Sequence, residues 1–383
     1  MKQKLFFVTT VPESLVFFEG QYSLLSDKFD ITAISSLPEE LDEYGAKYDI
    51  KVHYIPMERE ISLLTDIRGL IKFIRYFRKE RPVIVHGNTP KGSLLSMLAA
   101  WITRVPVRIY MCHGLRYQGC VGFKRHLLMM MERISCWCAT DVMCVSKGVA
   151  KVLNDDRITK KPPVVVWNGS VQGIDSSRFD PHKEFDKNSI RELYGLKAND
   201  FVLTFVGRIV TDKGINELVE AFMVLSKRHE DMRLLLIGNK ETEGNAISKD
   251  TESLIEENKS IISPGPQSNI PEILSITNLF VFPSYREGFG LSLMEAGAMG
   301  VPSVSSNIIG CNEVVEDGKT GLLIPPHSAN AIVEAVEQLY LNKALYEKMR
   351  DNCRPSIVER YERATLFSKF FEFYCTKAKS FIE

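Results

Sequence analysis

Short apolar segments, each followed by a longer amphipathic segment, recur through the first half of the chain. The apolar runs are continuous rather than alternating, which is typical of strands that are covered on both faces. Between them, segments such as 63–80 have helical spacing with Lys and Arg on one face. This pattern predicts a parallel sheet with helices on both sides. The expected strands are LFFVTT (5–10), ITAISS (31–36), VHYIP (52–56), VIVHG (83–87), VRIYMC (107–112), DVMCVS (141–146) and VVVWNG (164–169).

The same pattern restarts after the polar, irregular segment 170–189, which we interpret as a linker. From about Ser328 onward the chain is expected to be helical throughout. A second α/β unit is therefore predicted. Its expected strands are FVLTFVG (201–207), RLLLIG (233–238), SIISPG (260–265), LFVFPS (279–284), PSVSS (302–306) and GLLIPP (321–326).

The chain of 383 residues is longer than one hydrophobic core usually supports. We predict two Rossmann-like domains, residues 1–175 and 176–360, with a final helix in 361–383 that packs back toward the N-terminal domain. Ligands of such sheets bind beyond the carboxyl ends of the strands. Two such domains are expected to leave an interdomain cleft, so the loops directly after the strands are the ones to search.

Composition narrows the function classes. The formal net charge is +0, so no global field favours nucleic acid or anionic lipid, and nucleic acid is not an expected partner. The eight cysteines show no zinc spacing, and their scatter favours a reduced, cytoplasmic location. No segment approaches the roughly 18 uninterrupted apolar residues that a membrane-spanning helix needs.

The first candidate site follows the expected strand 201–207 and reads GRIVTDKG. Arg208 leaves the carboxyl end of that strand, and Lys213 lies where the next helix is expected to begin. A guanidinium can hold phosphate oxygens with two hydrogen bonds, and an ammonium adds a second positive charge. The alternative is that both side chains belong to a solvated surface loop.

The second candidate site is the more specific one, FPSYREGFGLSLMEA (282–296). It is expected to run from a strand, through a glycine-containing loop, into a helix that begins near Gly290. The backbone amides near the helix start are suited to a diphosphate. Glu295, about one turn into the helix, is within reach of ribose hydroxyls, and Glu287 in the loop is suited to hydroxyls of a sugar. The alternative is that Glu295 caps the helix and Glu287 is solvated. The expected donor-binding residues of this segment are Gly288, Phe289, Gly290, Leu291, Ser292 and Glu295.

These motifs resemble a known family. GRIVTDKG, PSYREGFGLSLMEAGAMGVPSVSS and EVVEDGKTGLLIPP look like the C-terminal half of the large retaining glycosyltransferase family 4, which has the GT-B fold. The family's E-x7-E pair is matched by Glu287 and Glu295. In the first half, VTTVPESLVFFEGQYSLL, IPMEREIS, VHGNTPKGSLLSMLAA and VPVRIYMCHGLRYQG resemble a bacterial subgroup that assembles capsule, O-antigen and related surface glycans.

The resemblance implies a role for individual residues. Arg208 and Lys213 match the family's basic pair that binds the donor diphosphate. Glu295 matches the carboxylate that binds the ribose, and Glu287 matches the glutamate that lies at the donor sugar. His113 matches a histidine near the reacting centre, and its place at a strand end before Gly114 suits that role. The alternative for His113 is a structural histidine at a strand edge.

Two further residues of the N-terminal half are acceptor-side candidates. His86 ends the expected strand 83–87, and an acceptor contact and a structural role are equally compatible with its position. Gly20 lies in the loop after the first strand, where it either passes close to a substrate or forms a plain turn. Pro12 and Glu13 occupy the place of the family's usual glycine-rich loop, so the sequence leaves undecided which residues of the loop after the first strand contact a substrate.

The resemblance implies a retaining transfer of a sugar from a nucleotide sugar, with UDP as the expected nucleotide, to a polyprenyl-diphosphate-linked or oligosaccharide acceptor. The chain has no D-x-D motif, so the cationic pair and the helix start are expected to stabilise the departing nucleotide without a metal. No enzymic nucleophile stands out, which leaves front-face attack with a diphosphate oxygen as the base.

Three other functions compete with this one. A sugar-nucleotide epimerase of the same fold would release free epimer without an acceptor. An inactive binding module is disfavoured by the presence of Arg208, Lys213, Glu287 and Glu295. A dinucleotide-dependent oxidoreductase is disfavoured because no G-x-G-x-x-G follows the first strand.

Segment 121–138 (VGFKRHLLMMMERISCWC) joins Lys124, Arg125 and His126 to an apolar stretch with three methionines and Trp137. A basic amphipathic helix of this kind suits the anionic inner face of the cytoplasmic membrane. The alternative is a core helix of the N-terminal domain.

Overall fold

The computed structural model describes residues 2–58, 60, 62–241 and 244–379 of the chain. It divides into two compact units, residues 1–173 with 363–383, and residues 174–362. The expected domain boundary at 175 and the expected final segment from 361 lie within two residues of these divisions. Each unit is built around a six-stranded, all-parallel sheet. The predicted α/β class with two Rossmann-like domains is confirmed.

The sheet of the first unit has the order β3-β2-β1-β4-β5-β6, so the direction of winding reverses between β1 and β4. Continuous apolar runs form its strands because helices cover both faces; Leu5 to Val8 of β1 are at most 1% exposed. The strands are β1 Gln3–Val8, β2 Phe29–Ser35, β3 Lys51–Tyr54, β4 Ile84–Gly87, β5 Val107–Cys112 and β6 Asp141–Cys144.

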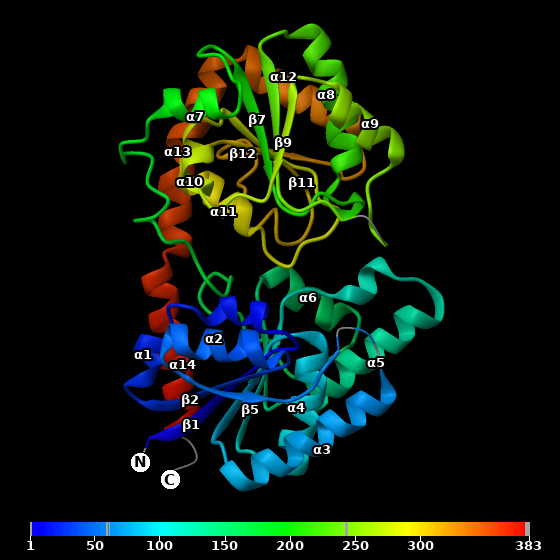
Figure 1. The fold of residues 1–383 in the computed structure, drawn as a ribbon, viewed down its shortest axis with the longest axis vertical. Helices are drawn as coiled ribbons and strands as arrows, with labels where there is room; N and C mark the ends of the chain where they lie inside the picture. The colour runs from blue at the N-terminus through cyan, green and yellow to red at the C-terminus, as the bar shows by residue number, and fades with distance from the viewer. Residues whose placement is uncertain (1, 59, 61, 242–243, 380–383) are drawn as a thin grey trace. The chain divides into compact units, whose positions relative to one another are not determined.

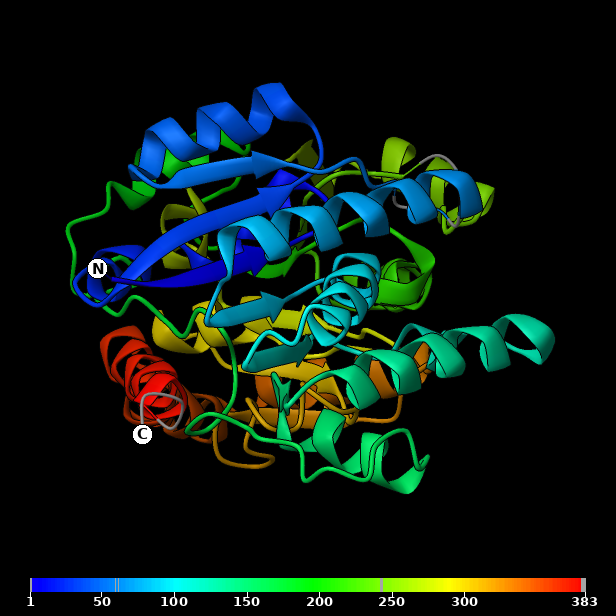
Figure 2. The same cartoon turned by 90° about the horizontal axis from the view of Figure 1, so that it is seen from below.

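Helices α3, α4 and α5 are neighbours in the first unit, and α1 contacts the C-terminal helix α14 (Figures 1 and 2). In Figure 1, α14 (red) lies beside α1 (blue), although the two are far apart in sequence. The helices of this unit are η1 Pro12–Phe18, α1 Tyr22–Ser26, α2 Pro38–Tyr48, α3 Leu63–Glu80, α4 Pro90–Ile102, η2 Arg116–Gly119, α5 Gly122–Cys138, α6 Lys147–Asp155 and α14 Arg363–Lys379.

The sheet of the second unit has the order β12-β11-β10-β7-β8-β9, which is the same winding with its reversal between β7 and β10. Its strands are β7 Phe201–Val206, β8 Met232–Ile237, β9 Ile261–Gly265, β10 Leu279–Phe282, β11 Ser303–Ser306 and β12 Gly321–Ile324. Its helices are α7 Lys187–Leu193, η3 Thr211–Lys213, α8 Ile215–Arg228, α9 Lys249–Glu257, α10 Ile270–Ser275, α11 Leu291–Ala298, α12 Ala329–Leu341 and α13 Lys343–Tyr361.

One expected strand is wrong. Segment 164–169 makes only an isolated bridge, in which Val164 pairs with Met143 at the end of the sheet. Trp167 has φ +53° and Ser170 has φ +69°, and backbone in this region cannot continue a strand. The apolar run therefore reflects burial beside β6 rather than a further strand. Within the expected linker 170–189, α7 begins at Lys187.

Candidate functional site

The candidate donor residues of the second unit lie where parallel-sheet folds bind ligands. The segment 207–214 follows β7 and the segment 283–290 follows β10, and these two strands are paired neighbours at the reversal point of the sheet. The two motifs, more than seventy positions apart in sequence, thus begin at the same edge. Gly214 has φ +70°, and a Cβ there would lie 2.1 Å from the Pro283 carbonyl oxygen, so the loops pack backbone to backbone.

Lys213 and Glu287 form an ion pair between these two loops. Their side chains are 16% and 13% exposed, so water screens the pair only weakly. The Ser284 hydroxyl donates a second hydrogen bond to Glu287 Oε1 at 2.9 Å. The lysine ammonium also lies 5.3 Å from the centre of the Phe282 ring. The structure therefore brings together the expected diphosphate cation and the expected sugar-binding carboxylate.

Additional contacts hold the two loops together. Arg286 donates two hydrogen bonds to Asp212 Oδ2, from Nη2 at 2.6 Å and from Nε at 3.0 Å. The Tyr285 amide donates to the Asp212 carbonyl at 2.8 Å. The Tyr285 hydroxyl donates to the Glu217 carboxylate at 2.6 and 2.7 Å. These supporting residues have no assigned role in the sequence interpretation. Asp212 and Arg286 are charged residues inside the two motifs, but the sequence does not reveal their partners, and Glu217 lies outside both motifs.

Arg208 takes a different partner. Its Nη1 lies 2.6 Å from Glu241 Oε1, in the segment after β8, and the two side chains are 55% and 37% exposed. An exposed pair of this kind contributes little to stability and leaves the guanidinium easy to redirect. In this structure the two expected diphosphate cations thus belong to separate ion pairs.

The glycine loop and the start of α11 are shaped by backbone contacts. The Gly290 amide donates to the Gly310 carbonyl at 3.0 Å, and the Leu291 amide donates to the Phe289 carbonyl at 3.0 Å. Of the expected amide donors to a diphosphate, these two already have acceptors. Ser292 lies in the first turn of α11, where backbone amides have no intrahelical acceptor. Glu295 lies on the same helix and is half-buried.

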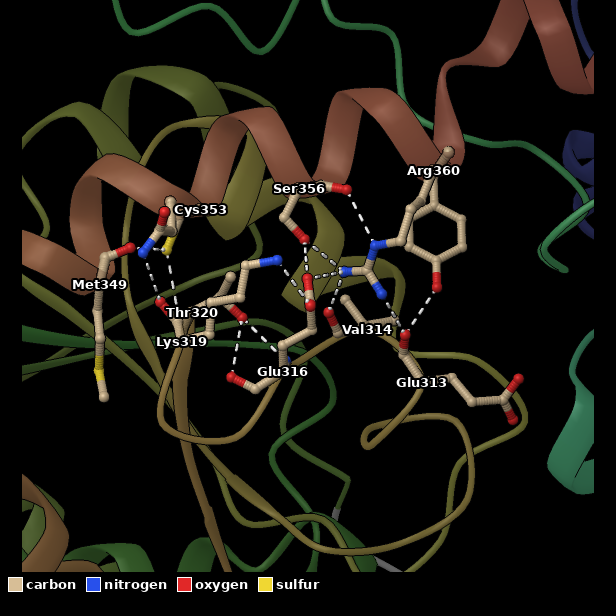
Figure 3. Close-up of polar contacts among 11 residues, drawn as sticks. Glu313, Val314, Glu316, Lys319, Thr320, Met349, Cys353, Ser356 and Arg360 are labelled. Atoms are coloured by element: carbon tan, nitrogen blue, oxygen red, sulfur yellow. Dashed lines mark hydrogen bonds and ion pairs between the residues drawn. The ribbon is translucent and has the colours of Figure 1, made fainter.

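Helix α13 braces the loop 311–320, which follows Gly310. The Arg360 guanidinium donates to the carbonyls of Glu313 at 2.9 Å and Val314 at 2.8 Å. Glu316 accepts hydrogen bonds from Lys319 and Ser356, and Arg360 lies 3.4 Å from its carboxylate. Figure 3 shows Ser356 and Arg360 pointing from α13 toward this loop. The brace holds the segment whose Gly310 carbonyl receives the Gly290 amide.

In the first unit, His113 follows β5 and is half-buried. Its ring stacks on Phe17 of η1 with the ring centres 4.4 Å apart, and its Nε2 is hydrogen-bonded to Asn88 Oδ1. Burial lowers the pKa of His113 to about 4, so the imidazole is neutral near pH 7. A neutral imidazole offers one donor and one acceptor nitrogen.

His86 and Gly20 are placed differently from His113. The His86 side chain is 0% exposed, its Nδ1 lies 2.7 Å from the Tyr374 hydroxyl of α14, and burial lowers its pKa to about 3. This placement favours the structural alternative for His86. Gly20 has φ +81° in a turn, and a Cβ there would lie 2.8 Å from the Phe367 ring of α14. Its position likewise fits a turn that packs against the C-terminal helix.

Helix α5 has a buried face and an apolar exposed face. Glu132 points inward and accepts a hydrogen bond from the Tyr110 hydroxyl, and burial raises the pKa of Glu132 to about 7. On the outside, Phe123 is 82% and Trp137 62% exposed, and Lys124 is exposed as well. The helix is therefore partly buried, and its outer face carries both apolar and basic side chains.

In the described part of the chain, no helix is long and apolar enough to cross a membrane. Within the same residues, no group of three or more His, Cys, Asp and Glu side chains is arranged to hold a metal ion.

Comparison with known proteins gives matches over both units. Residues 24–170 match the family described as Glycosyltransferase Family 4, and residues 186–355 match the family described as Glycosyl transferases group 1. The chain is 34% identical over 380 residues to the capsular polysaccharide biosynthesis glycosyltransferase CapM of Staphylococcus aureus, with 98% of each chain covered.

Two further similarities extend over nearly the whole chain. It is 26% identical over 360 residues to the UDP-Gal:alpha-D-GlcNAc-diphosphoundecaprenol alpha-1,3-galactosyltransferase of Escherichia coli, covering 92% of this chain and 91% of the other. The crystal structure of Anabaena HepE in complex with UDP superposes with a TM-score of 0.81 at 17% identity, covering 98% of this chain and 100% of that chain. At this identity the structural likeness establishes the shared fold.

Proposed function

Because the chain belongs to glycosyltransferase family 4 and is a GT-B glycosyltransferase that uses a nucleotide-sugar donor, we propose that it transfers the sugar of a UDP-sugar in surface-polysaccharide assembly. The acceptor is a polyprenyl-diphosphate-linked or oligosaccharide hydroxyl. The single observation that carries this proposal is the Lys213–Glu287 pair between the loops after β7 and β10. It joins a phosphate-binding cation to a hydroxyl-binding carboxylate at the ligand edge of the sheet.

In the proposed reaction the acceptor oxygen attacks the anomeric carbon of the donor. The bond from that carbon to the diphosphate oxygen breaks, the electron pair leaves with UDP, and the acceptor proton passes to a diphosphate oxygen. Attack on the same face retains the anomeric configuration. Lys213 and Arg208 stabilise the negative charge that develops on the departing diphosphate. Glu295 holds the ribose and Glu287 holds the transferred sugar.

The choice of UDP rests on relatives. The Escherichia coli relative carries UDP-Gal in its name, and the Anabaena structure contains UDP. Binding is proposed to need no metal, because the two cationic side chains supply the positive charge that a divalent ion would provide. The proposed roles assign the donor to the second unit and the acceptor to the first, where His113 is the candidate residue near the reacting centre.

A thermal-shift experiment tests the donor proposal. In EDTA, UDP is expected to raise the melting temperature by about 3 °C or more at 100 times its dissociation constant, because a ligand that binds only the folded state stabilises it. GDP is expected to give a smaller shift at the same concentration. Activity that EDTA abolishes and magnesium restores would contradict the metal-independent mechanism, and a larger shift with GDP would contradict the choice of base.

The lipid-linked acceptor implies work at a membrane surface, and we propose the outer face of α5 as the contact on the inner face of the cytoplasmic membrane. Exposed Val121, Phe123 and Trp137 supply apolar area, and Lys124 supplies positive charge next to it. Arg125 is half-buried and lies 5.8 Å from the Tyr117 ring, so it also has a role in packing.

Vesicle flotation tests this contact. The double variant Lys124→Glu with Arg125→Glu is expected to bind anionic vesicles about 30-fold more weakly, at about 1 kcal/mol for each basic residue lost near the surface. Lys343→Glu with Lys348→Glu changes the net charge equally on exposed positions of α13 and serves as the control. If the wild-type protein and both double variants were recovered equally with neutral and with anionic vesicles, α5 would be removed from the proposal. Equal activity on soluble and lipid-linked acceptors would remove the acceptor class.

A further inference from the structure

Asn88 and His113 meet at the carboxyl ends of two neighbouring strands. β4 and β5 pair in parallel up to Gly87 opposite Tyr110, so Asn88 comes one residue after this pair and His113 three residues after it, at the same edge of the sheet. Asn88 follows β4 directly and His113 follows β5 directly. Their side chains form a hydrogen bond between Asn88 Oδ1 and His113 Nε2. Asn88 is not among the residues that the sequence motifs single out.

The Asn88 side chain is held in place rather than free to turn. The residue is 1% exposed, and its backbone amide donates to the Val8 carbonyl of β1 at 2.9 Å. Its side-chain Nδ2 is buried and has no hydrogen-bond partner among the described residues. A buried amide that leaves one group unsatisfied is costly, and such groups in native proteins call for a specific reason. Here the satisfied half of the amide is the oxygen that faces the histidine.

This contact decides which nitrogen of His113 carries the proton. The pKa of His113 is lowered to about 4 by burial, so the ring is neutral at working pH. The nearby His86 of β4 is neutral as well, because burial and, to a smaller extent, the charge of His113 lower its pKa to about 3. A carbonyl oxygen can only accept, so with Asn88 Oδ1 toward the ring Nε2 is the protonated nitrogen and Nδ1 the acceptor, whereas an Asn88 amide turned by 180° would select the opposite tautomer. Stacking on Phe17 fixes the plane of the ring.

We propose that Asn88 is a positioning residue for the glycosyl transfer, which fixes His113 as the neutral Nε2–H tautomer so that Nδ1 accepts a hydrogen bond from a sugar hydroxyl. The proposal rests on the proposed role of His113 near the reacting centre. Asn88 acts through the imidazole and does not itself touch a substrate. The carboxamide suits this task because it accepts a hydrogen bond without carrying a charge that would favour the imidazolium.

The tautomer is measured directly on the unmodified enzyme. The measurement is the 15N chemical shift of each ring nitrogen in protein labelled with 15N at histidine. His113 Nδ1 is expected at the shift of an unprotonated nitrogen and Nε2 at that of a protonated nitrogen. The two signals that disappear in His113→Ala are assigned to this residue. A protonated Nδ1 in the wild-type enzyme would overturn the proposal regardless of any variant. A purely structural hydrogen bond would select the same tautomer, so the variants below separate the two roles.

Two variants then separate positioning from packing. Asn88→Ala is expected to lower kcat by about 10- to 100-fold, the range for a misplaced reacting group, with the Kd for UDP changed less than threefold. Asn88→Asp keeps the shape, but its carboxylate favours the imidazolium. Its kcat is expected to be low at acidic pH and to recover toward wild type as His113 loses its proton, an ionisation that wild type lacks above about pH 5. Asn88→Ala shows no such recovery.

The control is Ser96→Ala, a buried position of α4 in the same unit, which is expected to keep wild-type kcat at every pH. Wild-type kcat in Asn88→Ala, or a pH profile of Asn88→Asp that parallels wild type, would overturn the proposal. Full activity in His113→Ala would instead contradict the proposed function of His113, while the nitrogen signals would still report whether Asn88 sets its tautomer.

Discussion

Lys213→Ala is expected to lower kcat by about 10²- to 10³-fold, the loss that follows removal of one preorganised group that stabilises developing charge. The Lys213 side chain is only 16% exposed and lies between the Glu287 carboxylate and the Phe282 ring, so its charge acts in a poorly screened place. The charge that it faces in the proposed reaction grows as the bond to the diphosphate breaks. Turnover should therefore suffer more than ground-state binding of the donor.

The measurement is steady-state kcat and KM with a UDP-sugar, alongside UDP binding by calorimetry. Lys227→Ala removes an exposed lysine near the other end of α8 and is the matched control. Unchanged kcat in Lys213→Ala would contradict the proposed mechanism. Since Lys213 and Glu287 contact each other, their single and double variants should be non-additive, and additive losses would mean that the ion pair does not persist during the reaction.

Glu295→Ala and Glu287→Ala are expected to fail in different ways. Glu295, on α11, is proposed to hold the ribose, a part of the donor that does not change during transfer, so its loss should raise the Kd for UDP by about 10- to 100-fold. Glu287 is proposed to hold the sugar that reacts, so its loss should lower kcat more than it weakens UDP binding. Both carboxylates are half-buried, so each stays accessible to the ligand group that it is proposed to bind.

Glu287→Gln belongs in the same series, because alanine at this position also removes the partner of Lys213, whereas glutamine keeps an acceptor for the Ser284 hydroxyl. Glu334→Ala, at an exposed position of α12, controls for the loss of a carboxylate alone. UDP affinity that Glu295→Ala leaves unchanged would contradict the ribose assignment. Equal losses in binding and turnover for Glu287→Ala would contradict the assignment at the reacting sugar.

The amino-acid sequence by itself determined the fold class and the edge of each sheet where chemistry is expected. Continuous apolar runs identify strands covered on both faces, and twelve of the thirteen expected runs form strands. The exception, 164–169, has the apolar composition of a strand, but its backbone at Trp167 takes a positive φ that composition does not reveal. Because parallel strands present their carboxyl ends at one edge, a motif directly after a strand is placed by local sequence alone.

Only the tertiary structure decided which side chains meet. Lys213 and Glu287 are 74 positions apart, and Arg208 pairs with Glu241 rather than joining them. His86 is closed off by Tyr374, 288 positions away, so a strand-end histidine that suited an acceptor contact lies in the core. Asn88 meets His113 because β4 and β5 are paired neighbours whose carboxyl ends lie at the same edge of the sheet. Periodicity along the sequence indicates which face of a segment is buried. It does not indicate which distant segment covers that face, because this depends on the packing of the whole unit. That packing sets the partners, the burial and the pKa of each candidate group.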